Sequence, residues 1–264
     1  MQLIFIIFDL ILNILKMKKI IFTLFFVFAI TTINTQVIQS RLLKVDQVNM
    51  KEFVDGVSKK TKIYNSKKGQ SRYMTFKILT GIDAQNFVRM QVADSIQEFD
   101  NVYTEGNNYW RSKVGSIHQS IGNTIWSMSK KVSYYVENKE RVNHRRILFY
   151  NFNDSGAKDF WRFRERVKEA MIGSKYSQNM NVLYCNSGCN GNVVQVRFHH
   201  KNFAGQSSDY GVPLKKMIEK YDELYGEDAY EQDSQKVDES LMPNGRRVRH
   251  QVLLPELSSP ENMN

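Results

Sequence analysis

The sequence contains few of the residues and motifs on which recognisable enzyme chemistry depends. It has two cysteines and five histidines in 264 residues. It lacks G-x-S-x-G, G-x-x-x-x-G-K-[ST], H-E-x-x-H and G-x-G-x-x-G motifs, which argues against nucleophile-elbow hydrolases, P-loop NTPases, zincins and dinucleotide-binding enzymes. These absences favour a non-catalytic protein without excluding an enzyme, and no residue pattern indicates a cofactor.

The N-terminal segment contains no arginine, and this argues against a mitochondrial presequence, which is amphipathic and Arg-rich. Read from Met17, a basic start precedes an apolar stretch over 20–33, followed by small polar residues. This order is typical of a secretory signal peptide, and the stretch is short for a membrane span, which needs about 20 apolar residues. We therefore predict a signal peptide over 1–35 and secretion. The alternative is a membrane anchor formed by 1–33, and the true start is either Met1 or Met17.

Acidic residues are too few to balance the basic ones: 37 lysines and arginines face 27 aspartates and glutamates, a formal net charge of +10. From Gly226 onward eight acidic residues outnumber four basic ones, so the excess positive charge belongs to 36–225. Such an excess favours polyanionic partners, namely glycans, nucleic acid or anionic membranes. The alternative is that the charge serves solubility.

The two cysteines, Cys185 and Cys189, lie in the sequence CNSGC. Cysteines of a secreted protein are expected to pair, and Asn-Ser-Gly is a typical hairpin connection. A redox-active pair would have the spacing C-x-x-C, whereas three residues separate these two cysteines, and this argues against a redox role. A zinc site would need four ligands, and only one of His199 and His200 can share a strand face with the cysteines. We predict a disulfide and no metal.

Hydrophobic periodicity predicts a mixed α+β domain over 36–225. Alternating patterns predict a hairpin of strands near 72–80 and 87–94, with further strand runs in TIWSMSKKVSYYVEN, RRILFYNFND, NVLY and NVVQVRFHH. Helical patterns occur near 45–57, over 155–173 and from Pro213 to Leu224. The expected fold is a mainly antiparallel sheet with about three helices packed on it, without an internal repeat. The polar segment 226–264 is expected to be a disordered tail.

The helix expected over 156–172 is basic and carries the candidate polyanion site. Five cations contribute to it: Lys158, Arg162, Arg164, Arg166 and Lys168. The alternative is a solvated helix that packs through Phe160, Phe163 and Val167. Two processing signals accompany this site: an N-glycosylation acceptor at Asn153, and a basic protease site formed by Arg246, Arg247 and Arg249.

The leading functional hypothesis is a secreted or lumenal, non-catalytic basic protein that binds an anionic macromolecule or membrane surface. A second hypothesis is a membrane-anchored accessory subunit of a larger complex. A third is a secreted nuclease or other hydrolase in which His199 or His200 acts as general acid or base. Structural roles are favoured for both histidines, because no nuclease signature accompanies them.

Overall fold

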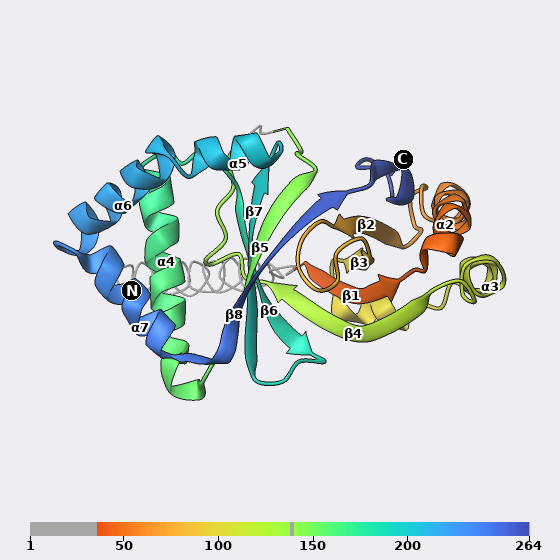
Figure 1. Cartoon of the computed structure of the whole chain (residues 1–264), viewed down its shortest axis with the longest axis horizontal. Helices are drawn as coiled ribbons and strands as arrows, with labels where there is room; N and C mark the ends of the chain where they lie inside the picture. Colours follow the sequence, from red (N-terminus) through yellow and green to blue (C-terminus); the bar gives the residue numbers. More distant parts are fainter. Residues whose placement is uncertain (1–35, 138–139, 264) are drawn as a thin grey trace, which may run out of the picture. The chain divides into compact units, whose positions relative to one another are not determined.

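The computed structural model describes residues 36–137 and 140–263, and these form one compact unit (Figure 1). The predicted leader over 1–35 lies outside the described residues. The chain runs twice through the order β-α-β-β-α-β, which is the ferredoxin-like arrangement. The first pass, the N-half, comprises β1 (Val37–Lys44), α2 (Met50–Tyr64), β2 (Arg72–Ile78), β3 (Phe87–Ala93), α3 (Thr104–Lys113) and β4 (Gln119–Met128).

The second pass, the C-half, follows the same order with a longer helical connection before its last strand. It comprises β5 (His144–Phe152), α4 (Ala157–Gly173), β6 (Met180–Ser187), β7 (Asn192–His200), α5 (Phe203–Asp209), α6 (Val212–Tyr225), α7 (Ala229–Glu239) and β8 (Leu241–Leu253). A short 3-10 turn, Pro255–Leu257, follows β8 and packs against the N-half helix α2 through Leu257.

The strands of the two halves close into a single antiparallel barrel. The strand order is the same in each half: hydrogen-bonded neighbours follow the order β4-β1-β3-β2 in the N-half and β8-β5-β7-β6 in the C-half. The halves join where β2 pairs with β8, from Phe76 to Ile78, and where β4 pairs with β6, from Ile125 to Met128. Closure leaves no free sheet edge in the barrel.

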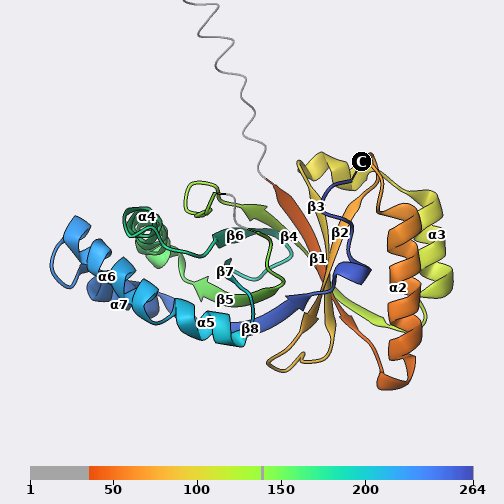
Figure 2. The same ribbon diagram turned by 90° about the horizontal axis from the view of Figure 1, so that it is seen from above.

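Successive side chains of each strand point to opposite faces of the sheet, and the buried ones form three separate hydrophobic layers. Leu148, Tyr150 and Val196 face α4, α6 and α7 on the outside of the C-half sheet. Ile38, Phe76 and Trp126 belong to the layer inside the barrel. Phe53 and Phe87 belong to the layer between the N-half sheet and its helices. Figure 2 shows the two sets of helices at opposite ends of the barrel.

The closed barrel corrects the expected open sheet with about three helices, because the described residues contain six α-helices and eight strands. The prediction of a disordered tail is also wrong, since 226–264 supplies α7 and β8, and β8 pairs with β5 along most of its length. The segment is polar in composition, but its arginines find partners elsewhere in the fold. Arg249 binds Asp83 at 2.7 Å, and the guanidinium of Arg247 lies 5.1 Å from the ring centroid of Phe149. No helix in the described ranges is long and apolar enough to cross a membrane.

Candidate functional site

A cavity of about 400 Å³ lies between the C-half sheet and its helices, and we call it the C-half cavity. Its volume is in the range of pockets that hold small molecules, about 300–1,000 Å³. Strands β5, β7 and β8 form its floor, and helices α4, α6 and α7 form its walls. Most of the lining is apolar or aromatic, including Leu148, Tyr150, Phe163, Val167, Met171, Phe198, Leu214, Met217 and Tyr230.

The side chain of Arg164 is the unusual member of this lining. It is 6% exposed, projects from α4 into the apolar layer, and makes no ion pair with any described residue. Its guanidinium lies 4.4 Å from the ring centroid of Phe163 and 5.4 Å from that of Tyr150, while its Nε is buried without a hydrogen-bond acceptor. Aromatic faces attract a cation but replace its lost hydration only in part.

Two further arginines of the C-half cavity already have partners. Arg146 donates from Nη1 to the hydroxyl of Tyr210 at 2.7 Å, and its guanidinium lies over the same ring. Arg246 pairs with Asp238 at 3.2 Å near the solvent. Asp238 is the only carboxylate in the lining among the described residues, so the cavity carries net positive charge.

Phenolic groups complete the polar part of the lining. Burial raises the pKa of Tyr230, although the charges of Arg164 and Arg246 oppose this. Burial likewise raises the pKa of Tyr210, against the effect of Arg146. Both phenols are therefore protonated at neutral pH, and each hydroxyl can donate a hydrogen bond. An aromatic wall with one unpaired cation and neutral phenols is suited to a flat molecule that carries an anionic oxygen.

The structure separates the five residues of the predicted polyanion site. Arg162 and Arg166 both bind the carboxylate of Asp233 on α7, at 2.9 and 2.7 Å. Lys168 donates to the backbone carbonyls of Lys130 and Lys131. Arg164 points inward, and Lys158 alone is exposed. The helix therefore presents no continuous basic face.

The adjacent histidines point to opposite faces of β7. His200 is buried on the helix side, with Nδ1 2.7 Å from Oδ2 of Asp209. His199 lies opposite Arg145 of β5 and faces the barrel interior. No group of three potential metal ligands of the His, Cys, Asp and Glu types occurs within 36–137 and 140–263.

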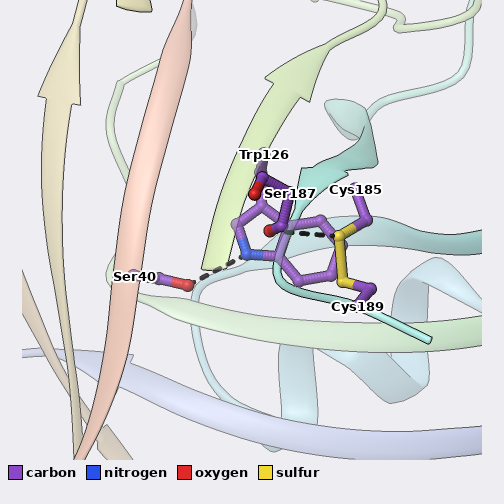
Figure 3. Close-up of a disulfide and its surroundings, with 5 residues drawn as sticks. All are labelled: Ser40, Trp126, Cys185, Ser187 and Cys189. Carbon is purple, nitrogen blue, oxygen red and sulfur yellow. Dashed lines mark hydrogen bonds between the residues drawn. A yellow bond between two sulfur atoms is a disulfide. The ribbon is translucent and has the colours of Figure 1, made fainter. Parts of the chain in front are cut away.

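The two cysteines are joined where β6 leads into the loop before β7. Their Sγ atoms are 2.03 Å apart, and Gly188 between them adopts a φ of +85°, which favours glycine. Cys185 is the strand partner of Trp126, and Figure 3 shows the disulfide lying against the indole ring. The indole Nε1 donates to the hydroxyl of Ser40 at 2.9 Å, so the disulfide and the indole connect β6, β4 and β1.

The predicted processing residues lie in ordered structure. The side-chain oxygen of Asn153 accepts hydrogen bonds from the Gly156 amide and the Ser155 hydroxyl. This oxygen caps the 3-10 turn that precedes α4, and the structure offers no support for the predicted glycan at this residue. Arg246, Arg247 and Arg249 lie within β8, so the premise of a protease site in a disordered tail is wrong.

The sequence analysis did not identify most of the residues that line the C-half cavity. Of the predicted site residues only Arg164 and Arg246 line it, and neither was assigned this role. A signal was present in RRILFYNF, where Arg146, Leu148 and Tyr150 alternate and therefore share one face of the strand. The helix residues that meet this face come from segments far along the chain, and pattern alone does not pair them.

No protein-family model matches the sequence, and no curated protein matches it. Solved structures share the fold at low identity. A protein provisionally assigned as a monooxygenase from Fusobacterium nucleatum has a TM-score of 0.57 at 8% identity, covering 87% of this chain and 96% of that one. A second such protein, from Lactobacillus acidophilus, has a TM-score of 0.56 at 12% identity, covering 87% and 98%. A double mutant of the chlorite dismutase from Candidatus Nitrospira defluvii has a TM-score of 0.54 at 7% identity, covering 84% and 92%.

These comparisons establish the fold, and they correct the functional hypothesis. The expected non-catalytic, anion-binding protein rested on an excess of positive charge, a basic helix and an acidic tail taken as disordered. The helix is paired internally, the tail is part of the barrel, and the solved structures that share the fold are described as monooxygenases and a chlorite dismutase. The histidine-hydrolase alternative gains no support, because His199 and His200 lie on opposite faces of β7. Secretion and the membrane anchor depend on residues within 1–35, which lie outside the described residues, and both stay predictions.

Haem is a common carrier of oxidative chemistry in proteins. Haem iron is most often held by a histidine or a cysteine thiolate. No histidine and no cysteine is among the described residues that line the C-half cavity, and both cysteines are joined in the disulfide. The lining does not fit a histidine- or thiolate-ligated haem, and we derive no step through one.

Proposed function

We propose that this chain is an oxidoreductase that binds a small, flat, conjugated molecule with an anionic oxygen in the C-half cavity and oxidises it there. The observation that carries the proposal is the guanidinium of Arg164, which is buried against aromatic rings without an acidic partner. The chemistry named for the structures that share the fold supports the choice of an oxidative reaction.

The unpaired guanidinium defines the role of Arg164 in this reaction. A buried cation next to a phenolic or enolic hydroxyl lowers the pKa of that hydroxyl and stabilises the oxyanion. The oxyanion is the more electron-rich form and hence the form that is more easily oxidised. Tyr150 and Phe163 hold the guanidinium in place, and the aromatic lining excludes water from around the bound molecule.

Anthrone is a suitable probe because its enol form is a flat aromatic hydroxyl compound. Its oxidation by one molecule of oxygen gives anthraquinone and one molecule of water, which balances all atoms. We expect oxygen uptake and anthraquinone formation above the rate of the protein-free solution. Arg164→Met should lower this rate by roughly ten- to a hundredfold, because a hydrogen bond to a charged group contributes about 1.5–3 kcal/mol.

Binding is measured separately, so that a wrong choice of reaction does not conceal a correct site. The aromatic carboxylate 2-naphthoate should bind more tightly than the neutral 2-naphthylmethanol, and Arg164→Met should abolish the difference. Lys158→Met is the matched control, because Lys158 lies on the same helix but is exposed. Equal binding of both probes to the wild type, together with no oxygen uptake, would show that the proposal is wrong.

A further inference from the structure

A second cavity, of about 320 Å³, lies inside the barrel, and we call it the barrel cavity. All eight strands contribute to its lining, so it is distinct from the C-half cavity outside the sheet. Its two sides differ in chemistry. Arg145, Arg197 and His199 project from β5 and β7, whereas apolar residues such as Ile38 and Phe76 face them from β1 and β2.

Arg145 is 2% exposed and has only neutral partners among the described residues. Its Nε and Nη2 both donate to Oε1 of Gln251, at 3.0 and 2.5 Å. Nη2 also approaches the sulfur of Met90 at 3.6 Å, and the guanidinium lies 3.3 Å from the ring centroid of Phe76. Burial and the neighbouring cations lower the pKa of Arg145 well below its ordinary value.

Arg197 repeats this arrangement on the neighbouring strand. It is 3% exposed, and its Nε and Nη2 donate to Oε1 of Gln195 at 2.9 and 2.6 Å. Burial lowers the pKa of Arg197 to about 9. In both arginines, therefore, one side of the guanidinium is held by a glutamine, and Nη1 makes no hydrogen bond to a described residue.

The acidic residues of the barrel cavity do not neutralise these two cations. Glu140 and Glu261 are exposed at the mouth, and Glu261 lies 4.0 Å from Arg141, which is also at the mouth. His199 adds no negative charge, because burial and the charges of Arg145 and Arg197 lower its pKa to about 3 and keep it neutral. Two buried cations without a carboxylate are costly unless an anion joins them.

We infer that the barrel cavity is a second binding site, which takes a small aliphatic carboxylate with the carboxylate at Arg145 and Arg197 and the apolar chain against the opposite strands. A planar carboxylate accepts hydrogen bonds from guanidinium groups in matched geometry. The side chains of Ile38, Phe76, Val92, Met128 and Leu253 offer apolar contact to the rest of the molecule and therefore favour a hydrocarbon chain, while polar residues such as Arg72 and Asn181 complete the lining.

The inference is tested by thermal unfolding of the full chain with hexanoate as the probe. At about a hundred times its Kd, hexanoate should raise the Tm of the wild type by roughly 5–10 °C. Hexanol is the control without the charge, and acetate and inorganic phosphate are the controls without the hydrocarbon chain. Each of the three should raise the Tm much less than hexanoate does at the same concentration.

Substitution locates the probe. Arg145→Met should raise the Tm without ligand, because an unpaired buried cation is replaced by a hydrophobic side chain of similar length, and it should abolish the response to hexanoate. Arg197→Met provides the same test independently, in case one variant folds poorly. Arg111→Met is the control for an exposed arginine, and Arg164→Met is the control for the C-half cavity. Both controls should respond as the wild type does.

Four results would overturn the inference. The first is no hexanoate response in the wild type, and the second is an undiminished response in both Arg145→Met and Arg197→Met. The third is an equal response to phosphate, which would show an anion site without selection for a hydrocarbon chain. Loss of the response in Arg164→Met would place the probe in the C-half cavity instead and would also overturn the inference.

Discussion

Five cationic side chains are buried without an acidic partner within 36–137 and 140–263: Lys60, Arg89, Arg145, Arg164 and Arg197, each 6% exposed or less. Part of the net charge that suggests a surface for polyanions is therefore inside the molecule. Each cation lies beside an aromatic ring or a neutral oxygen, which hold a charge less well than a carboxylate does. Three of the five line the two cavities for which we propose ligands.

Lys60 and Arg89, two of these five cations, lie in the N-half next to the ring of Tyr73. The Nζ of Lys60 lies 4.8 Å from the ring centroid and the guanidinium of Arg89 lies 4.5 Å from it. Lys60 also donates to Oδ1 of Asn65 at 2.7 Å. Burial lowers the pKa of Lys60 to about 7, and the charges of Arg89 and Arg41 contribute to the same shift.

This shift predicts that stability depends on pH in a defined window. Because the pKa of Lys60 is near 7 in the folded state and near 10.5 when unfolded, the unfolded state binds more protons between these values. The free energy of unfolding should therefore rise with pH across this window, by up to about 1.4 kcal/mol per pH unit. Lys60→Met should remove this part of the rise.

Urea unfolding at several pH values from 7 to 10 measures the effect, and the slope is compared between variants so that other titrating groups cancel. Lys59→Met is the control, because Lys59 is the exposed neighbour on the same helix. Identical slopes for Lys60→Met and the wild type would show that Lys60 titrates normally in the folded protein.

At the scale of elements, α4 and α7 are held together by one acid. Asp233 on α7 is 4% exposed and accepts from Arg162, from Arg166 and from the hydroxyl of Tyr221, the last at 2.7 Å. Burial opposes its ionisation, but the three donors outweigh this and lower the pKa of the carboxyl. The arginines predicted to bind an external polyanion are thus occupied by this internal anion.

Removing this carboxylate should destabilise the protein. We expect Asp233→Ala to lower the free energy of unfolding by about 2–4 kcal/mol, since it leaves two arginines and a buried hydroxyl without their acceptor; the arginines' partial exposure keeps the loss below that of a fully buried pair. Urea unfolding measures the change. Glu231→Gln on the exposed face of α7 should have little effect, and an equally small effect of Asp233→Ala would contradict the assigned role.

Elements with strong periodicity were predictable from the sequence. The structure confirms three of these elements: the hairpin of β2 and β3, the helix α4, and the helix α6 starting near Pro213. The helix α4 buries the predicted stripe of Phe160, Phe163 and Val167. Arg164 was also accessible to this reasoning, because it lies four residues after Phe160 and three before Val167, on the same helix face. The helix α7 and strand β8 were missed because they carry few apolar residues in a regular pattern. Ion pairs formed in the folded structure hold many of their charged residues instead.

At the scale of the molecule, the two halves share an order of elements but no repeat that is visible in the sequence. The C-half differs from the N-half in its connection to the last strand, which contains three helices where the N-half has α3 alone. Barrel closure depends on short ladders, Phe76 to Ile78 with β8 and Ile125 to Met128 with β6. Because any strand of suitable pattern could form such a ladder, local sequence does not distinguish a closed barrel from an open sheet.

Closure predicts that the two halves unfold together. The layer inside the barrel contains Ile38, Phe76 and Trp126 from the N-half and Leu183 and Leu253 from the C-half, so separating the halves would expose apolar surface on both. Neither half can lose its structure without removing this shared layer. We therefore expect a single cooperative transition for the unit that spans 36–263.

Two full-length variants with one tryptophan each can test this cooperativity. One keeps Trp126, which is 5% exposed inside the barrel, and the other keeps Trp161, which packs edge-on against Phe160 at 5.3 Å in the C-half. The other tryptophans are replaced by Phe. Within each variant, the urea midpoint from tryptophan fluorescence should coincide with the midpoint from far-UV circular dichroism, because both report the same all-or-none event. If Trp126 and Trp161 instead report midpoints that differ from circular dichroism in opposite directions, the halves unfold separately and the shared layer inside the barrel contributes little to the stability of either.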